Sequence, residues 1–380
     1  MSSHIPTGRK LLVVSDTSMT RCDGKIQGFE PVVRELDSIS NLFDQIIWLG
    51  YSQKESKAAM SIPLSANIKL VTMPSSGGTG ILAKVQILIY YLIYFIYILR
   101  YLPGITHLHS RAPSHPALIA MWLSKKMNAI ICWHKYAGSW NEPNPPKSYA
   151  FQRSYLASIH KKNVYGTING KWPNQEKHLI TFENPCLFEA ELAKARTIAA
   201  SKNFDNKLTL LFVGNLSAFK GILQLVKALE MIEDTNRFEH LYIAGDGAMK
   251  NELIQLAQKS HKIKISVLGA VNRDELVKLY SNAHVNILPS ESEGFPKVIA
   301  EGAAYGCIPL VTDVSSIGQY IHHEQNGFLL KNNLPETIAH NLNTIASHHQ
   351  LKKISENVVT MTSQFTYEYF NSKINSHFIQ

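Results

Sequence analysis

The stretch HVNILPSESEGFPKVIAEGAAYGCIPLVTD, residues 284–313, contains one complete strand–loop–helix–strand unit. Two short apolar runs, 284–290 and 308–313, flank a segment in which Pro296 is well placed as the first residue of a helix. Short apolar strands that alternate with helices are typical of a parallel β-sheet buried on both faces. This stretch therefore predicts an α/β fold.

The same pattern repeats along the chain. The apolar runs are 10–15, 45–50, 68–73, 106–110 and 129–134 in the first half, and 208–214, 240–245, 263–269, 284–290 and 308–313 in the second. Two series of strands alternating with helices predict two doubly wound domains, and 380 residues are enough for both. We place the N-terminal domain at residues 1–200 and the C-terminal domain at 201–363.

The positive charge is concentrated in the N-terminal half. Residues 1–200 contain 22 Lys and Arg against 12 Asp and Glu (+10), and residues 201–380 contain 16 against 17 (−1), which gives the net charge of +9. A basic surface attracts nucleic acid, anionic lipid or phosphorylated substrates. No recognition-helix pattern, zinc-ligand spacing or RNA-binding aromatic motif accompanies it, so we expect no nucleic-acid partner.

The cysteines indicate a reducing compartment. Cys22, Cys132, Cys186 and Cys307 are widely spaced and form no CxxC pair. The first ten residues are polar and lead into a predicted strand, which is not the pattern of a signal peptide. We therefore expect reduced thiols and a cytoplasmic location.

The segment KVQILIYYLIYFIYILRYLPG, residues 84–104, contains 15 consecutive uncharged residues. As a helix they span about 22 Å, less than the roughly 30 Å hydrocarbon core of a bilayer. Four tyrosines at spacings of 4, 3 and 4 form one stripe suited to a membrane interface: Tyr90, Tyr94, Tyr97 and Tyr101. Three alternatives remain: a helix with its tyrosines rimming the domain core, a helix lying on the membrane, and a spanning helix. The acid-free basic surround favours docking of residues 84–102 on anionic lipid.

Three loops in the C-terminal half should lie together, because open α/β sheets bind ligands at the carboxyl ends of their strands. In the first, FVGNLSAFKG (212–221), Lys220 at a helix start suits a phosphate, although an exposed lysine is the alternative. In the second, YIAGDGAMKNEL (242–253), Lys250 occupies the third glycine position of a dinucleotide fingerprint. That substitution argues against a nicotinamide cofactor.

The third loop joins a helix start to two carboxylates. The amides of Lys297 and Val298 are expected to be unsatisfied at the positive end of the helix dipole, where a phosphate would bind them. Glu293 and Glu301 cannot hold phosphate by charge, so hydroxyl groups are their expected partners. A nucleotide or a sugar nucleotide carries both phosphates and hydroxyls.

The segments FVGNLSAFKG, LYIAGDG, VLGAVNRDELVKLYSNAHVNILPSESEGFPKVIAEGAAYGCIPLVTD and NGFLL, within residues 212–330, closely resemble the C-terminal domain of retaining glycosyltransferases of family 4. Two glutamates separated by seven residues are that family's most specific mark. The resemblance implies the GT-B fold, in which two Rossmann-like domains face each other across a cleft and a final segment, here 364–380, packs back on the N-terminal domain. It also implies a UDP- or GDP-linked sugar donor, retention of anomeric configuration, no cofactor and no required metal.

The resemblance also implies roles for individual residues. Glu301 would bind the ribose hydroxyls, Glu293 would lie beside the transferred sugar, and Lys220 would supply charge to the diphosphate. The other donor-binding residues expected are Asn215, Gly269, Ala270, Val271, Gly294, Phe295, Pro296, Lys297 and Val298. Asn215 stands where the family often has an arginine, so one usual cationic contact to the diphosphate is absent.

In the N-terminal half, GITHLHSRAPSHPALIA (104–120) resembles the strand and loop that place a histidine beside the reacting sugar. His109 is therefore a catalytic candidate together with Glu293 and Lys220, the alternative being a hydrogen-bonded histidine that caps a strand. The acceptor-side candidates are Gly28, Arg111, His134 and Trp140. For Trp140, packing is the alternative.

These observations predict an enzyme that moves a sugar from a nucleotide-sugar donor to a glycan or lipid-linked acceptor. We expect it to act in the synthesis of a bacterial surface polysaccharide, such as lipopolysaccharide, at the inner face of the cytoplasmic membrane. One alternative is a sugar-nucleotide epimerase or hydrolase with the same fold. Another is a non-catalytic, membrane-docked sugar-nucleotide binder.

Overall fold

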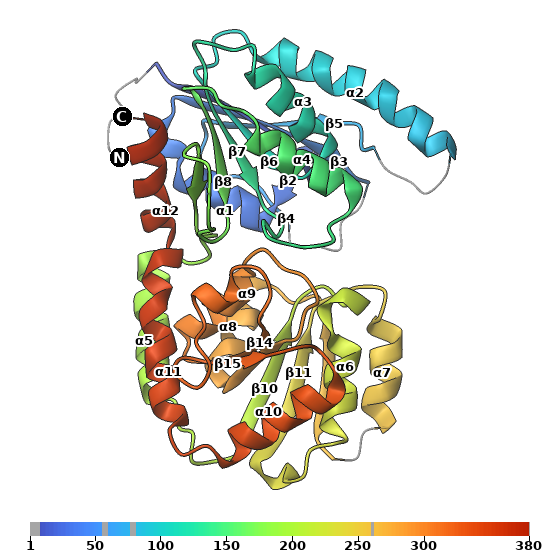
Figure 1. The fold of residues 1–380 in the computed structure, drawn as a ribbon, viewed down its shortest axis with the longest axis vertical. Helices are drawn as coiled ribbons and strands as arrows, with labels where there is room; N and C mark the ends of the chain where they lie inside the picture. The colour runs from blue at the N-terminus through green and yellow to red at the C-terminus, as the bar shows by residue number, and fades with distance from the viewer. Residues whose placement is uncertain (1–7, 55–59, 77–80, 260–261, 380) are drawn as a thin grey trace. The chain divides into compact units, whose positions relative to one another are not determined.

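The computed structural model describes residues 8–54, 60–76, 81–259 and 262–379, with side chains described from residue 86 onward in the helix that begins at Ile81. The chain divides into two compact units (Figure 1). Unit 1 comprises Met1–Phe182 with Asn371–Gln380, and unit 2 comprises Glu183–Phe370. The junctions differ from the boundaries at 200 and 363 because helix α5 (Glu189–Ser201) packs against helices α8, α9 and α11 of unit 2.

Unit 1 is built on a nine-stranded sheet. Seven of its strands are parallel, in the order β5-β3-β1-β6-β7-β8-β9. They are β1 (Lys10–Cys22), β3 (Gln45–Ser52), β5 (Ile68–Met73), β6 (His107–Ala112), β7 (Ile131–Tyr136), β8 (Val164–Ile168) and β9 (Leu179–Thr181). All five strands expected in this half are present, and the doubly wound order agrees with the prediction.

The first strand is longer than its apolar run. β1 continues to Cys22 and turns back at Asp23 and Gly24, where φ is 50° and 75°, into the antiparallel strand β2 (Lys25–Phe29), which pairs with β4 (Met60–Ser61). Gly28 is buried in β2, and a Cβ there would lie 2.5 Å from the Trp48 ring. This segment is therefore a hairpin, and Gly28, one of the acceptor-side candidates, is needed for close packing on Trp48.

Unit 1 also contains four helices and the C-terminal segment of the chain. The helices are α1 (Glu30–Ser38), α2 (Ile81–Tyr101), α3 (His115–Ser124) and α4 (Lys147–Ala157). Helix α12 (Tyr367–Ile374) continues into a π-helix (Asn375–Ile379), and Phe378 stacks on Trp133 with ring centroids 4.9 Å apart. The Phe378 carbonyl also lies 3.0 Å from His107 Nε2. Phe378 is thus part of the unit 1 core.

Helix α2 packs its tyrosine stripe inward. Tyr94 is fully buried, donates a hydrogen bond to the Pro74 carbonyl at 3.0 Å, and stacks with Tyr51 and Tyr90. Tyr90, Tyr97 and Tyr101 are half-buried and pack against the same core. This arrangement agrees with the alternative in which the tyrosines rim the domain core. Within the described part of the chain, no helix has both the length and the apolar character needed to cross a membrane.

Unit 2 contains a sheet of six parallel strands in the order β12-β11-β10-β13-β14-β15. The strands are β10 (Leu208–Val213), β11 (Phe238–Ala244), β12 (Lys264–Gly269), β13 (Val285–Leu288), β14 (Ile308–Thr312) and β15 (Phe328–Leu330). This is the strand order of a Rossmann sheet, and it reverses between β10 and β13.

Helices cover both faces of the unit 2 sheet (Figure 1). One group contains α6 (Ile222–Leu229), α7 (Lys250–Lys259) and α10 (Pro335–Ser347). The other contains α5, α8 (Arg273–Asn282), α9 (Lys297–Ala304) and α11 (Leu351–Thr360). The buried side chains between these layers form one continuous core.

Candidate functional site

Two loops of unit 2 meet at the point where the strand order reverses. The loop after β10 runs from Gly214 to Gly221, and the loop after β13 runs from Pro289 to Pro296. They are joined by a hydrogen bond from the Glu291 amide to the Phe219 carbonyl, at 2.9 Å. Open parallel sheets bind ligands in the crevice at such a reversal.

Gly221 allows these loops to approach closely. Its φ is 67°, and a Cβ built on it would lie 2.1 Å from the Pro289 carbonyl oxygen. Any other residue would push the two loops apart, so the glycine fixes the position of the preceding Lys220.

Lys220 and Glu293 form an ion pair across the two loops. Lys220 ends a short 3-10 turn (Ala218–Lys220), and the exposed fractions of the two side chains are 25% and 11%. The sequence assigned these residues to one site, one for phosphate and the other for the sugar. The structure brings them into direct contact.

Helix α9 begins one residue later than expected. Pro296 was predicted as the first helical residue, but it has φ −70° and ψ 126° and is the N-cap, so Lys297 is first. The pyrrolidine ring fits the cap because its φ is fixed near −65° while ψ stays extended. No side chain caps this end of the helix.

Phe295 anchors this loop in the core of unit 2. Its ring stacks on Phe365 at 4.7 Å and lies edge-on to Tyr320 at 4.8 Å. Its carbonyl accepts a hydrogen bond from Asn184 Nδ2 at 3.1 Å. The Ser316 hydroxyl donates to the Gly294 carbonyl at 3.2 Å, which holds the turn before the helix.

Glu301 is held by two donors that the sequence did not single out. Arg273 Nη1 donates to Glu301 Oε1 at 2.8 Å, and the Tyr280 hydroxyl donates to Oε2 at 3.3 Å. Arg273 Nη2 also donates to the Cys186 carbonyl at 3.3 Å. In the sequence of an amphipathic helix, an arginine is expected on the surface and a tyrosine in the core. The spacing of Arg273 and Tyr280 therefore did not indicate their contact with Glu301.

The charges of this cluster follow from burial and pairing. Burial lowers the pKa of Arg273, but the carboxylates of Glu301 and Glu191 outweigh it and hold that pKa above its ordinary value. Burial, and then the Glu301 charge, raise the pKa of Tyr280. Arg273 is therefore a cation and Tyr280 a neutral donor, while each Glu301 oxygen keeps a second lone pair for another hydroxyl.

The GxG motif packs backbone against backbone. The Gly245 amide donates to the Gly269 carbonyl at 2.7 Å, and a Cβ on Gly245 would lie 1.8 Å from the Gly214 carbonyl oxygen. Lys250 pairs with Asp246 at 3.0 Å. The close backbone contacts between neighbouring loops thus explain why glycine is needed at both positions of the GxG motif.

The remaining donor-site candidates lie on the same edge of the sheet. Gly269, which ends β12, has φ 78°, and the exposed Ala270 and half-buried Val271 follow it. Asn215 is exposed after β10. The structure therefore brings the predicted donor residues of unit 2 to the carboxyl ends of β10, β12 and β13.

In unit 1, His109 and His134 are buried. His109 is 4% exposed, lies 3.2 Å from the Trp133 carbonyl and stacks on the Trp133 ring. His134 is fully buried, with Ser110 Oγ 2.7 Å from Nδ1 and Ser124 Oγ 3.0 Å from Nε2. Burial lowers the pKa of each imidazole to about 3. Within unit 1, His134 is enclosed, whereas His109 retains a small exposed fraction.

Arg111 belongs to a charge cluster around Glu35, a carboxylate of α1 that is 2% exposed. Arg111 Nη1 lies 2.5 Å from Glu35 Oε1, and Lys135 Nζ lies 3.1 Å from Oε2. Trp140 packs edge-on against Tyr136 at 5.4 Å. In this structure, the acceptor-side candidates Arg111 and Trp140 thus have partners within unit 1.

Two Rossmann-like, parallel-sheet units in one chain define the GT-B fold. The crystal structure of a glycosyltransferase from Rickettsia africae superposes with a TM-score of 0.64 over 97% of each chain, at 18% identity. The Anabaena protein HepE in complex with UDP and glucose gives 0.66 over 96% of this chain and 98% of that chain, at 12% identity. At these identities the similarity establishes the fold.

Within this fold, residues 194–358, which lie in unit 2, match the sequence profile of the family described as Glycosyl transferases group 1. An uncharacterized glycosyltransferase of Methanocaldococcus jannaschii is 34% identical over 168 residues, which are 43% of each chain. A putative teichuronic acid biosynthesis glycosyltransferase of Bacillus subtilis, TuaC, is 25% identical over 66% of this chain and 63% of its own. The first of these matches thus spans less than half of the relative.

Proposed function

We propose that this protein is a retaining glycosyltransferase that moves a sugar from a nucleotide-sugar donor to a glycan or lipid-linked acceptor. The observation that carries the proposal is the arrangement of Glu293 and Glu301, each paired with a cation beside the uncapped start of α9. The glycosyl transferases group 1 domain and the nucleotide and sugar bound by HepE support it.

The donor is expected to bind along the carboxyl edge of the unit 2 sheet. The diphosphate would accept hydrogen bonds at the N-terminus of α9, where no side chain competes for the first amides. Glu301, oriented by Arg273 and Tyr280, would accept hydrogen bonds from two ribose hydroxyls. A UDP- or GDP-linked sugar has the required groups.

Donor binding would exchange the partner of Lys220. A diphosphate carries more negative charge than one carboxylate, so it would draw the Lys220 ammonium away from Glu293. The carboxylate of Glu293 would then be available to the hydroxyls of the transferred sugar. The ion pair thus keeps both side chains in place until the donor arrives.

Retention fits a front-face substitution in this site. The sugar becomes oxocarbenium-like as the nucleoside diphosphate departs, and the departing phosphate takes the acceptor's proton. Lys220 and the α9 amides stabilise the charge that develops on the leaving group, and Glu293 stabilises the positive sugar. No cofactor, catalytic metal or separate protein base is required by this scheme.

One face of unit 1 supports the proposal that the acceptor is lipid-linked and lies in a membrane. Opposite its buried tyrosine, α2 exposes a row of aliphatic side chains: Leu88, Ile89, Leu92, Ile96 and Leu99. The exposed fractions of Leu92 and Ile96 are 59% and 55%, which is unusual for large apolar residues on one helix face. This row extends over the neighbouring helices.

Between α2, α3 and α4 the apolar face is hollowed into a groove of about 530 Å³. It is lined by Leu92, Phe95, Leu118, Ile119, Trp122, Phe151 and Tyr155. Lys125 lies 4.1 Å from the ring centre of Tyr155, and Lys126 lies 4.4 Å from that of Trp122. Cations beside an exposed apolar face match an anionic lipid surface.

We propose that this apolar face, defined by the α2 row and the groove, docks on the inner, cytoplasmic surface of an anionic membrane. A lipid-linked acceptor would then be within reach of the enzyme, as in synthesis of a surface polysaccharide such as lipopolysaccharide. The name of TuaC supports a polysaccharide pathway.

The function is tested in two steps. Thermal-shift measurements with UDP, GDP and their sugar conjugates should first identify a stabilising donor. Transfer from that donor to lipid-linked or glycan acceptors should then yield a product with the donor's anomeric configuration in NMR spectra, also in the presence of EDTA. Isomerised or hydrolysed donor without transfer would favour the epimerase or hydrolase alternative, and stabilisation without any turnover would favour a non-catalytic binder.

A further inference from the structure

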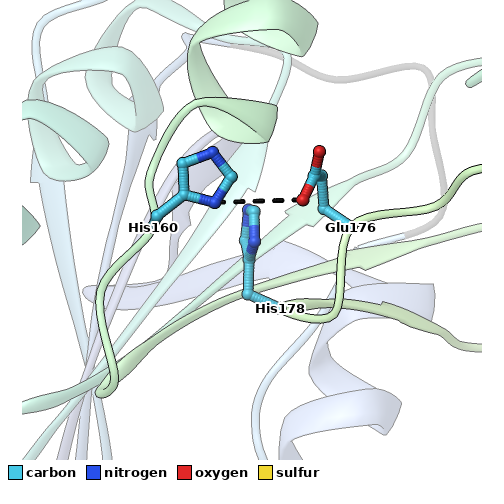
Figure 2. Close-up of side chains that lie close together, drawn as sticks. All are labelled: His160, Glu176 and His178. Atoms are coloured by element: carbon cyan, nitrogen blue, oxygen red, sulfur yellow. Dashed lines mark ion pairs between the residues drawn. The ribbon is translucent and has the colours of Figure 1, made fainter.

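Three side chains of unit 1 that the proposed function does not use converge on one point: His160, Glu176 and His178 (Figure 2). Nδ1 of His160 lies 3.9 Å from Oε2 of Glu176. The two imidazole rings meet edge to face, with centroids 5.3 Å apart. One potential ligand atom from each residue lies within 4.8 Å of the others.

The backbone holds these residues from two connections. His160 follows α4, whereas Glu176 and His178 belong to the connection from β8 to β9. The His178 carbonyl accepts a hydrogen bond from the Gly166 amide of β8, and the Leu179 amide donates to the Glu176 carbonyl, both at 2.9 Å. These hydrogen bonds hold the backbone at Glu176 and His178 in place.

A hydrogen bond fixes the tautomer of His178. Its Nε2 lies 3.1 Å from the Leu156 carbonyl oxygen, which can only accept, so Nε2 carries the proton. The lone pair of the neutral ring is then on Nδ1. A histidine whose second nitrogen donates to a backbone carbonyl is the usual arrangement in metal sites.

The direct His160–Glu176 contact does not account for the cluster. The two side chains are 64% and 51% exposed, and 3.9 Å is longer than a hydrogen bond. Exposed pairs of this kind contribute little to stability. The neighbouring Lys161 does not compete for the carboxylate, because its ammonium donates to the carbonyls of Ser124, Lys125 and Met127.

We propose that His160, Glu176 and His178 form a binding site for a divalent transition cation of the Zn²⁺ type. Two neutral imidazoles and one carboxylate are a donor set that Zn²⁺ accepts, with a water in the fourth position. Ligand bonds of about 2.1 Å place tetrahedral donors about 3.4 Å apart. The candidate ligand atoms lie within 4.8 Å of one another, so rotation of the exposed His160 and Glu176 side chains would bring them toward that separation.

The cation would join the segment after α4 to the connection between β8 and β9. The cation takes no part in the sugar-transfer scheme. A negative result for the metal site would therefore leave the proposed function unaffected, and the reverse is also true.

The test is titration of the untagged full chain with ZnCl₂ by isothermal calorimetry at pH 7.5, and with CoCl₂ by visible absorption. We expect one cation per chain and the intense d–d bands of tetrahedral Co²⁺. Glu176→Gln, which keeps the side-chain shape, and His160→Ala should each weaken binding by roughly tenfold or more. His340→Ala, at an exposed histidine of α10 in unit 2, is the matched control and should bind like the parent.

Circular dichroism of each variant separates lost binding from lost folding. The proposal is overturned if the parent chain binds no Zn²⁺ at micromolar concentrations, or if Glu176→Gln and His160→Ala bind it as tightly as the parent. Equal loss in His340→Ala would also overturn it, because the cation would then be held elsewhere.

Discussion

Lys220 and Glu293 are 73 residues apart in sequence and form an ion pair where the strand order of the unit 2 sheet reverses. Each comes from a loop that follows one of the two central strands, β10 and β13. The pair thus joins the two loops at the position where a parallel sheet of this order binds ligands.

Lys220→Met should weaken nucleoside diphosphate binding by roughly 10- to 100-fold, which corresponds to the loss of one charged hydrogen bond of about 1.5–3 kcal/mol. Lys227→Met, at an exposed lysine of α6, is the control and should leave affinity unchanged. Calorimetric titration at two salt concentrations measures both. Equal affinities for the two variants would exclude Lys220 from diphosphate binding.

Substitutions of Glu293 and Glu301 should have different effects on donor binding and on turnover. Glu301→Ala removes the ribose acceptor, so it should weaken donor binding more than Glu293→Ala does. Glu293→Ala should mainly slow turnover, by roughly 100-fold, as expected when one electrostatic contact to the transition state is lost. Donor titrations and initial rates on both variants test this, and small, equal effects would contradict the assignment.

Glu301→Ala should also destabilise unit 2, because it removes the carboxylate to which Arg273 Nη1 and the Tyr280 hydroxyl donate. A buried donor that loses its partner costs about 1–3 kcal/mol. Tyr280→Phe removes a single hydrogen bond and should cost about 1 kcal/mol. Calorimetric melting without donor distinguishes this effect from lost binding, and an unchanged melting temperature for Glu301→Ala would show that the cluster is not structural.

The two unit sheets were predictable because buried parallel strands are short apolar runs, and each of the ten runs is a strand. The Glu293–Lys220 site was predictable because both residues follow such strands. The Arg273–Glu301 contact was not, since it depends on how α8 and α9 pack. The burial of His134 was not predictable either, because its partners Ser110 and Ser124 come from a neighbouring strand and a helix. Sequence spacing also could not show which side of α2 faces the core.

The buried histidines predict an acid-sensitive unit 1. The pKa of His134 is lowered by burial from 6.5 to about 3 in the folded chain, so the unfolded chain binds more protons between these values. Stability should therefore decrease as the pH falls from 6.5 toward 3, by about 1.4 kcal/mol per pH unit for each such histidine. Above pH 7 this contribution is constant.

Tryptophan fluorescence isolates the effect, because all five tryptophans lie in unit 1. Urea unfolding between pH 5 and 8 should show a smaller pH dependence for His134→Asn than for the parent chain. His340→Asn, at an exposed histidine of α10, should retain the full dependence. A His134→Asn chain with the parent's slope would mean that this ring titrates normally.

The apolar face of unit 1 should bind anionic vesicles. Leu92→Ser together with Ile96→Ser removes exposed aliphatic area at about 25 cal/mol per Å², so the double variant should lose most of its binding. Lys125→Glu with Lys126→Glu should remove the salt-dependent part, because attraction between exposed charges is screened within about 10 Å at 0.1 M salt. Neither change touches buried core, so both chains should fold.

Leu64→Ser is the matched control, because Leu64 is a fully solvated apolar residue of unit 1 that lies outside the groove. Co-sedimentation with vesicles of phosphatidylcholine and phosphatidylglycerol, at low and high salt, measures all four chains. Parent and Leu64→Ser should sediment with the vesicles at low salt, and Leu92→Ser with Ile96→Ser should remain mostly in solution. Lys125→Glu with Lys126→Glu should sediment less than the parent at low salt, and its binding should no longer depend on salt. If the parent does not bind, or if it forms a dimer that Leu92→Ser with Ile96→Ser disrupts, the face serves a protein contact and the membrane assignment fails.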